Sequence, residues 1–580
     1  MKTNTTSVVD VDLDPNEALS KIINSGMQKG GPKYFFPTSK LEEVLERKRI
    51  EATLRGVRLR LPAEEQIVSK VTEFVTKNAR PIFAGLVMMG KPWLITSFYV
   101  NGFGRENLPI RYTFRKDNTL DFGLGHSDAG KDINTMFRGG GLVWKEREIE
   151  DFCKDMQWEF TAPTFAKEKF RYEFAAGTVL PFTTPLEPLG SGGSARVEKA
   201  AIHRDHIDLS TLPLCQRSSL GETKHPVIAL KTLESGTPED REKDAEKEAR
   251  NLEAVRKLQS DNLIKAIAYC RIGKAHCFLF PLADYGNLWL FWVARMKEKE
   301  EGQSHRGDNN FLVWVFTQLV GIADSLVELH GDVPNIRHGD LKPENILCFQ
   351  DGSCAVTRNK RKPAGPSIRL VLTDVGISKK HKGPTKQRDV TSTLVSTTRY
   401  EPPEMEQTRE DHSKLSRRFD MWSFGCILLE FLIWLLYDIE GLVNFTRALK
   451  EGFYESDKKG THIHPIVSQW IENIKHDKRN CGKGSPFRDL VYLIEERLLI
   501  VQVESLQSET AESNTSRRRK FPGTLALCKS PRATGTIVKG LTIGRRPDPV
   551  RASAKDMRDE LKRILGNIER EGFEVKRASP

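Results

Sequence analysis

The chain has 580 residues, a formal net charge of +12 from 90 basic and 78 acidic residues, and a hydrophobic content of 38%. This composition is typical of soluble globular protein, and the length exceeds one ordinary core, so we expect several domains or a two-lobed domain with an extension. The modest basic excess permits anionic partners without requiring one. The nine cysteines include no C-x-x-C pair, which argues against a disulfide scaffold or a zinc site and favours a reducing compartment.

No targeting segment is expected. The first residues are polar and acidic, unlike a secretory signal. The most apolar run, Phe424–Tyr437, has 14 residues and contains Glu430, whereas a membrane helix needs about 20 apolar residues. We therefore predict a buried core helix, no membrane partner and a cytoplasmic location. A nuclear location is the alternative, because the basic cluster Arg517–Lys520 would suit an import signal.

Residues 1–31 are predicted to be disordered, and residues 32–175 to form a separate α/β region with an unknown partner. In that region the apolar residues Leu41, Val44, Leu45 and Leu54 predict a helix over Leu41–Leu54. A second helix is expected near Ala63–Lys77, and the segment Pro92–Val100 is strand-like.

Residues 182–569 show strands first and helices afterwards, which predicts an α+β fold with a sheet-rich lobe and a larger helical lobe. Strands are expected at Leu180–Leu189, Ala195–Ile202, Val227–Lys231, Leu263–Tyr269 and Cys277–Leu282, with a charged helix at Glu239–Leu258. Residues 201–226, 350–366 and 503–546 are predicted surface insertions. A last helix, Ser553–Glu569, precedes a tail at 570–580.

The segment HGDLKPEN, residues 338–345, carries the most specific signal. Phosphoryl transfer needs a carboxylate for the substrate hydroxyl, a cation on the moving phosphoryl group and oxygen ligands for magnesium. A tight loop places Asp340, Lys342 and Asn345 around one point. The alternative is a helix cap followed by a turn, which the same residue types also favour.

A second carboxylate, Asp374, ends the apolar run Ile368–Leu372 and precedes Val375 and Gly376. An Asp at a strand end can hold magnesium between phosphates. By itself, Asp-x-Gly is a common turn; its position downstream of Asp340 strengthens the interpretation.

The glycine cluster comprises Gly190, Ser191, Gly192, Gly193, Ser194, Ala195 and, two residues on, Val197. Glycines let backbone N–H groups approach phosphates. A dinucleotide-binding loop would be followed directly by a helix, whereas Ala195–Ile202 is predicted to be a strand, which favours a hairpin over the phosphates.

Lys231 ends the buried-strand pattern VIALK, where a charge is costly unless it is used. ATP phosphates and a helix glutamate would use it. Glu248 is the preferred partner because Leu252 and Val255 follow it at core spacing, and Glu246 is the alternative.

Taken in order, these motifs resemble the eukaryotic-type protein kinase catalytic domain over residues 182–569. The resemblance implies a bilobal fold, with ATP and Mg²⁺ as cofactors and Asn345 and Asp374 as metal ligands. It implies adenine contacts from Val197, Ala229, Phe280 and Ala283, with Asp420 bracing the catalytic loop and Arg551 paired with Glu404. Lys342 and Thr397 resemble the serine/threonine class, so protein substrates with Ser or Thr are implied. The N-terminal region is similar to extensions on kinase-like proteins of filamentous fungi.

Three departures from the family pattern leave the chemical groups in place. Gly339 stands where many kinases have an Arg that pairs with a phosphorylated activation loop, so we hypothesise weak dependence on phosphorylation of Thr391, Ser392, Thr393 or Ser396. Val375 replaces Phe, and Ala195 replaces a third glycine.

The predicted function is an active serine/threonine protein kinase. The alternatives are a pseudokinase scaffold or nucleotide-gated binding module, and an interaction module at residues 32–175 with the kinase as its output. Nucleic-acid binding through Arg517–Lys520 is disfavoured, since a short basic cluster is more often a solvated loop.

Overall fold

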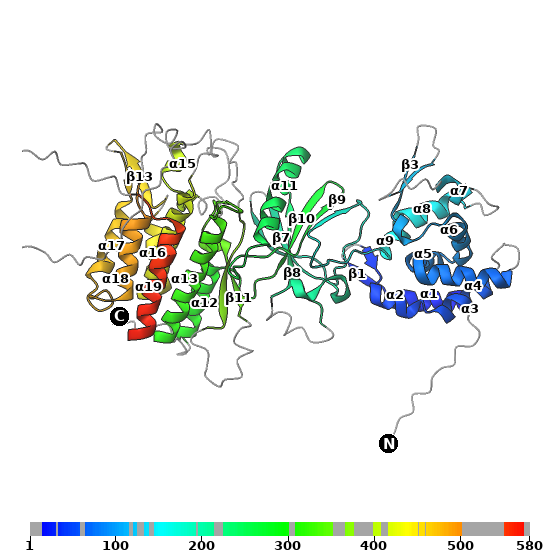
Figure 1. Cartoon of the computed structure of the whole chain (residues 1–580), viewed down its shortest axis with the longest axis horizontal. Coiled ribbons are helices and arrows are strands. Elements are labelled where there is room, and N and C mark those ends of the chain that lie inside the picture. The colour runs from blue at the N-terminus through cyan, green and yellow to red at the C-terminus, as the bar shows by residue number, and fades with distance from the viewer. Residues whose placement is uncertain are drawn as a thin grey trace, which may run out of the picture. The chain divides into compact units, whose positions relative to one another are not determined.

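The computed structural model of the chain is shown in Figure 1. It describes residues 14–30, 33–57, 64–114, 120–124, 133–138, 144–192, 195–213, 224–300, 308–351, 366–375, 398–407, 416–449, 452–458, 460–501 and 550–573. The chain divides into two compact units. Unit 1 consists of residues 1–291 and 346–377, and unit 2 of residues 292–345 and 378–580.

The first part of unit 1 is a mostly helical N-terminal region around an apolar core that fully buries Phe83, Phe98 and Phe152. Its helices are α1 (Pro15–Gly26), α2 (Thr38–Val44), α3 (Arg47–Gly56), α4 (Glu64–Phe74), α5 (Arg80–Met88), α6 (Ile95–Asn101), α7 (Ile133–Arg138), α8 (Glu146–Asp151) and α9 (Gln157–Glu159). Its strands pair as β1 (Gln28–Gly30) with β2 (Lys33–Phe35) and β3 (Ile110–Phe114) with β4 (Leu120–Leu124).

The predicted disorder of residues 1–31 is wrong for helix α1. Asp14 accepts a hydrogen bond from the Asn16 backbone N–H, and Pro15 occupies the first turn. Leu19 and Ile23 lie one turn apart on the same face and are buried in the core. This short amphipathic pattern lies within a polar, acidic stretch, which is why composition alone predicted disorder. Residues 1–13 lie outside the described residues.

Two other predictions in this region need correction. Pro92–Val100 is not a strand: it forms a 3-10 turn at Pro92–Leu94 and then α6, because burial among helices overrides the strand preference of its aromatic and β-branched residues. The helix predicted over Leu41–Leu54 is split into α2 and α3, since Leu45 (ψ 53°) and Glu46 (ψ 154°) leave helical geometry. The helix expected near Ala63–Lys77 is confirmed as α4.

The second part of unit 1 is a six-stranded sheet with the order β5-β9-β10-β8-β7-β6. Strand β5 runs parallel to β9, and all other neighbours are antiparallel. The strands are β5 (Arg171–Phe174), β6 (Glu187–Gly192), β7 (Ala195–Ala201), β8 (Val227–Leu233), β9 (Ala268–Ile272) and β10 (Ala275–Pro281). The strands predicted at β7, β8 and β10 are confirmed.

Two predicted strands begin later than expected. The first starts at Glu187 rather than Leu180, because Pro181 and Pro185 lack the N–H groups that a ladder needs. The second starts at Ala268 rather than Leu263. Of the predicted insertion 201–226, residues 202–213 include the buried side chains of Ile207 and Leu212, so this part is packed into the unit rather than a purely surface loop.

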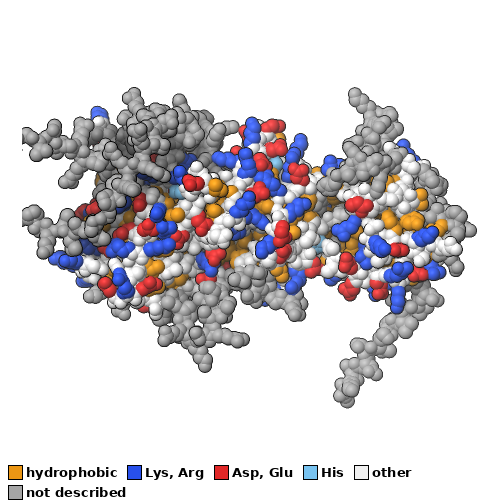
Figure 2. Space-filling view, viewed as in Figure 1, with side chains coloured by type: hydrophobic (Ala, Val, Ile, Leu, Met, Phe, Trp, Pro, Cys, Tyr) orange, Lys and Arg blue, Asp and Glu red, His pale blue; other side chains and the backbone are white. Residues whose placement is uncertain are grey.

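Helix α11 (Pro238–Val255) confirms the predicted charged helix and packs beside the sheet. Its face toward the sheet buries Ala245, Ala249 and Leu252 in one cluster with Phe278 and Phe280. Where α11 lies in Figure 1, the surface in Figure 2 shows interspersed basic and acidic side chains. The antiparallel pair β11 (Ile346–Gln350) and β12 (Ile368–Leu372) completes the unit.

The N-terminal region and the sheet share a buried junction within unit 1. Phe35, fully buried, meets the rings of His203 and His206 edge-on, with centroids 6.0 and 5.6 Å away. The Thr38 backbone N–H donates to His206 Nε2 over 3.2 Å. A parallel bridge joins Phe165 to Ile207. The two parts of unit 1 are therefore packed together rather than joined only by the chain.

Unit 2 is mainly helical. Its elements are α13 (Asn309–Leu329), α15 (Glu404–Gln407), α16 (Arg418–Ala448), α17 (Pro465–His476), α18 (Pro486–Leu493), α19 (Ala554–Glu571) and the pair β13 (Tyr454–Asp457) with β14 (Gly460–Ile463), while α12 (Leu288–Glu300) begins in unit 1. The sheet followed by helices confirms the predicted α+β class, and α16 confirms the buried core helix.

Helix α13 is long and apolar enough to cross a membrane by length and composition, but 67% of its most apolar window is buried inside the structure. A core helix has the same composition, so this single helix is weak grounds for a membrane span. α13 packs against α19, where Lys562 Nζ pairs with Asp324 over 3.0 Å. The predicted last helix is confirmed as α19, which buries Met557 and Leu561.

Candidate active site

Lys231 lies on β8 with only 7% of its surface exposed. Its Nζ is 2.8 Å from Glu248 Oε1 and 2.8 Å from Asp374 Oδ1. Burial alone would lower the pKa of Lys231, but the two carboxylates outweigh burial and raise it, so the amine is charged. The predicted pair with Glu248, rather than Glu246, is present in the structure.

Asp374 follows β12 and adopts a left-handed backbone conformation, with φ at 58°. Few non-glycine residues take this conformation, and such residues are common at functional sites. Its side chain is 34% exposed, so it can reach solvent while it contacts Lys231. Val375 is buried and fills the apolar slot expected of it, and Gly376 lies outside the described residues.

The glycine cluster forms the predicted hairpin. In it β6 and β7 pair so that Gly190 faces Val197 and Gly192 faces Ala195. A strand, not a helix, follows the loop, which removes the dinucleotide-loop alternative. A Cβ built on Gly190 would meet nothing within 4 Å, so space is left beside the backbone there. Gly193 and Ser194 fall outside the described residues.

Of the residues expected near adenine, Val197, Ala229 and Phe280 lie on strands of the same sheet, and Ala283 follows β10. Phe280 on β10 faces Ala229 on β8, and Phe278 faces Lys231. Phe280 is 7% exposed and joins one apolar cluster with Ala229 and Ala283. Unit 1 thus brings together the glycine hairpin, Lys231, Glu248 and Asp374 with this apolar wall.

In unit 2, the loop at residues 338–345 holds its three chemical side chains close together. Asn345 Nδ2 donates to Asp340 Oδ2 over 3.0 Å and to the Asp340 carbonyl over 2.7 Å. Lys342 Nζ lies 3.2 Å from Asp340 Oδ2. All three residues are buried at 9% exposure or less. The predicted convergence of a carboxylate, a cation and an amide is present, and a plain cap-and-turn would not bury all three.

Asp420, on α16, braces this loop as predicted. It accepts the backbone N–H groups of His338 and Gly339, each over 2.8 Å, and a 2.7 Å hydrogen bond from His330 Nε2. Burial would raise the pKa of Asp420, but the His330 hydrogen bond, the nearby histidines and the Gly339 N–H together lower it. A fixed anion therefore holds the loop backbone.

Arg551 is the predicted partner of Glu404. Its Nη1 lies 2.6 Å from Glu404 Oε1, and the Arg551 guanidinium also donates to the carbonyls of Arg418 and Ile500. The guanidinium is fully buried and lies over the Trp422 ring at 5.2 Å. These contacts fix the start of α15, whose first residue is Glu404.

Several predicted residues lie outside the described part of the chain. They are Gly193, Ser194, Gly376, Thr391, Ser392, Thr393, Ser396, Thr397 and Arg517–Lys520.

Two polar groups were not singled out by the sequence. Tyr400 donates to Glu430, with its hydroxyl 2.8 and 3.0 Å from the two carboxylate oxygens, and both residues are buried. The sequence marks Glu430 only as the one charged residue in the apolar run Phe424–Tyr437. Arg171 on β5 contacts two glutamates of α11, and no motif surrounds it.

The comparisons with known proteins agree with this geometry. Residues 218–439 match the family model described as protein kinase domain, so the chain contains a protein kinase domain over these residues. The match is narrower than the predicted 182–569, and the glycine hairpin lies upstream of it.

Similar curated proteins are kinases. The chain is 24% identical to cysteine-rich receptor-like protein kinase 25 of Arabidopsis thaliana over 410 residues, which cover 69% of this chain and 48% of that protein. It is 30% identical to receptor-like protein kinase BRI1-like 3 of the same plant over 36% of this chain and 15% of that protein. It is 29% identical to serine/threonine-protein kinase nekl-2 of Caenorhabditis elegans over 33% of this chain and 50% of that protein. The chain thus spans half or less of these relatives.

Proposed function

We propose that this protein is an active kinase that transfers the γ-phosphate of ATP to serine or threonine hydroxyls of protein substrates. The observation that carries the proposal is Lys231, a buried and charged amine held between Glu248 and Asp374. A buried lysine with two carboxylates is costly as mere structure, whereas a phosphate-binding site uses its charge. Relatives described in their names as serine/threonine-protein kinases support the substrate class.

Each residue has one role in this proposal. Asp340 orients the substrate hydroxyl and accepts its proton, and its contacts with Asn345 and Lys342 fix the position of its carboxyl group. Lys342 places a positive charge on the moving phosphoryl group. Lys231 binds the α- and β-phosphates of ATP, which are not transferred. The glycine hairpin covers the phosphates, and Phe280 and Ala229 contribute to the apolar wall for adenine.

The side chains present fit magnesium. Asn345 directs its Nδ2 to Asp340, which leaves the amide oxygen as the atom that can face a cation, and Asp374 offers a partly exposed carboxylate. Mg²⁺ is usually held by one or two protein oxygens together with substrate phosphates, so each of these oxygens is a suitable ligand. The ion would neutralise phosphate charge.

The test is phosphate transfer from ATP and Mg²⁺ to a generic protein substrate. We expect Asp340→Asn and Lys231→Met to lower kcat/KM by about three orders of magnitude or more, because positioning and charge stabilisation supply most of this catalysis. The matched controls are Asp324→Asn and Lys77→Met, which remove the same groups from surface pairs. The controls should stay near wild type.

Two results would reject the proposal. If the wild type binds ATP but transfers no phosphate to several substrates, the pseudokinase scaffold is the better reading. If Asp340→Asn or Lys231→Met matches its control, the assigned residues are wrong.

A further inference from the structure

Strand β5 adds an edge to the sheet from the segment that precedes the residues matching the kinase family. Arg171 is paired in register with Tyr269 of β9, and the Tyr269 N–H donates to the Phe170 carbonyl over 2.8 Å. Residues 171–174 are thus part of the sheet, and the segment 167–174 is held to it rather than being a loose connection.

The same segment contacts helix α11 in three ways. Phe170 is buried in the cluster that includes Ala245, Ala249 and Leu252 of the helix. Arg256, at the end of the helix, donates to the Lys167 carbonyl and lies over the Phe170 ring at 5.2 Å. The third contact is Arg171.

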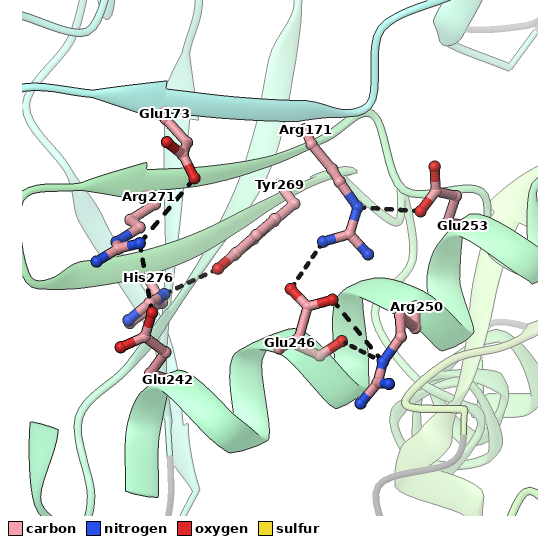
Figure 3. Close-up of polar contacts among 9 residues, drawn as sticks. All are labelled: Arg171, Glu173, Glu242, Glu246, Arg250, Glu253, Tyr269, Arg271 and His276. Carbon is pink, nitrogen blue, oxygen red and sulfur yellow. Dashed lines mark hydrogen bonds and ion pairs between the residues drawn. The ribbon is translucent and has the colours of Figure 1, made fainter. Parts of the chain in front are cut away.

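Arg171 bridges two glutamates of α11, as Figure 3 shows. Its Nη1 is 2.8 Å from Glu246 Oε2, and its Nε is 3.0 Å from Glu253 Oε2. Glu246 and Glu253 are two helical turns apart and share one face. The Arg171 side chain is 34% exposed, and its guanidinium lies over the Tyr269 ring at 5.9 Å.

Glu248 projects from a different face of the same helix. It is 6% exposed and points to Lys231, whereas the two glutamates held by Arg171 face outward and are over 40% exposed. A helix tied along its outer face over two turns cannot easily rotate or slide, and either motion would break the 2.8 Å contact of Glu248 with Lys231.

We propose that Arg171 is a positioning residue that holds α11 where Glu248 contacts Lys231. The part of the chain needed for kinase activity would then begin upstream of residues 218–439, which match the kinase family. This rests on the proposed kinase function. Arginine suits the role because its planar fork reaches both carboxylates, whereas the point charge of lysine reaches one.

The test uses the full chain and a double-mutant cycle. Arg171→Ala should lower kcat/KM for ATP by about three- to tenfold, the size expected for losing two partly exposed ion pairs, and Arg171→Lys should fall between it and wild type. Because Arg171 acts through Glu248, Arg171→Ala should have no further effect on kcat/KM once Glu248 is Gln. A general loss of stability would lower activity in both backgrounds.

Arg250→Ala is the matched control. It removes a cation that pairs with Glu246 from within the helix, at 3.8 Å, and leaves the tie to β5 intact. Its kcat/KM should stay near wild type. Equal kcat/KM in Arg171→Ala and Arg250→Ala, or an undiminished effect of Arg171→Ala in the Glu248→Gln background, would overturn the proposal.

Amide hydrogen exchange tests the positioning role of Arg171 independently of the proposed kinase activity. Amides of residues 238–255 should exchange faster in Arg171→Ala than in Arg250→Ala whether or not the wild type transfers phosphate. A wild type without activity would reject the kinase function alone. Unchanged exchange in Arg171→Ala would reject the positioning role alone.

Discussion

At the scale of single residues, Gly339 stands where the kinase family pattern has an arginine, and its backbone conformation suits glycine. Its φ is 79°, a left-handed conformation that glycine takes at little cost, and its N–H is held by Asp420. With no side chain at 339, the loop has no cation there to pair with a phosphorylated segment. The hydrogen bonds from the His338 and Gly339 N–H groups to Asp420 do not supply the missing positive charge, but they hold the loop in place.

We therefore expect phosphorylation of residues 391–396 to matter little to the proposed activity. A variant with Thr391, Ser392, Thr393 and Ser396 all changed to Ala should keep kcat/KM within about threefold of wild type, since the main cation for an ordering switch is missing. Phosphate transfer to a generic substrate measures this. A loss of activity comparable to that of Asp340→Asn would contradict it.

Glu430 gives a pH-dependent prediction at the same scale. Burial raises its pKa to about 8, against the opposing hydrogen bond from Tyr400. The folded protein thus holds a proton that the unfolded chain loses above about pH 4.5. The free energy of unfolding should fall as pH rises from about 5 to about 8, by on the order of a few kcal/mol from this group.

Urea unfolding of wild type and Glu430→Gln between pH 5 and pH 8 tests this. The glutamine resembles the protonated carboxyl, so the variant should match wild type near pH 5 and exceed its stability near pH 8. The difference between the two proteins isolates Glu430 from other titrating groups. A difference that does not change with pH would contradict the prediction.

The sequence predicts site residues well where chemistry demands a fixed type and spacing. Asp340, Lys342 and Asn345 converge as expected because their close spacing places them on one tight loop. Glu248 was separable from Glu246 by its core spacing. Arg171 and Glu430 were not predictable, because their partners lie 75 residues and 30 residues away along the chain and no local pattern links them.

At the scale of elements, the residue pattern predicted α11 from its charged run, α16 from its continuous apolar run and α19 from its helical spacing. It failed at Pro92–Val100, where Trp93, Phe98 and Tyr99 suit a strand by propensity but pack in a helical core. The failure has a physical cause. The conformation of a short segment depends on the residues that bury its side chains, and those residues lie elsewhere in the sequence.

At the scale of the whole molecule, the main feature is the packing of the N-terminal region on the sheet within unit 1. Phe35 is the central residue of that junction, enclosed by His203, His206, Trp158 and Val179. Burial also lowers the pKa of both histidines, that of His203 to about 4, which keeps their rings neutral against the phenyl ring near neutral pH.

Phe35→Ala should therefore lower the free energy of unfolding by about 3 kcal/mol, as for other fully buried aromatic residues, and should split one unfolding transition into two. Tyr34→Ala, on the same strand but 46% exposed, is the control and should change stability by about 0.5 kcal/mol or less. Chemical denaturation followed by fluorescence measures both. Equal effects of the two variants would show that the junction is not held at Phe35.

Strand β5 has one more consequence for the molecule as a whole. A sheet edge is a row of unpaired N–H and C=O groups that can recruit a foreign strand, either from a binding peptide or from another unfolded chain. Because β5 pairs with β9, the edge on that side of the sheet is a four-residue strand rather than the longer β9. A fragment trimmed to residues 218–439 would lose β5, β6 and β7 and would expose the edges of β9 and β8, so we expect it to be prone to aggregate for reasons unrelated to catalysis.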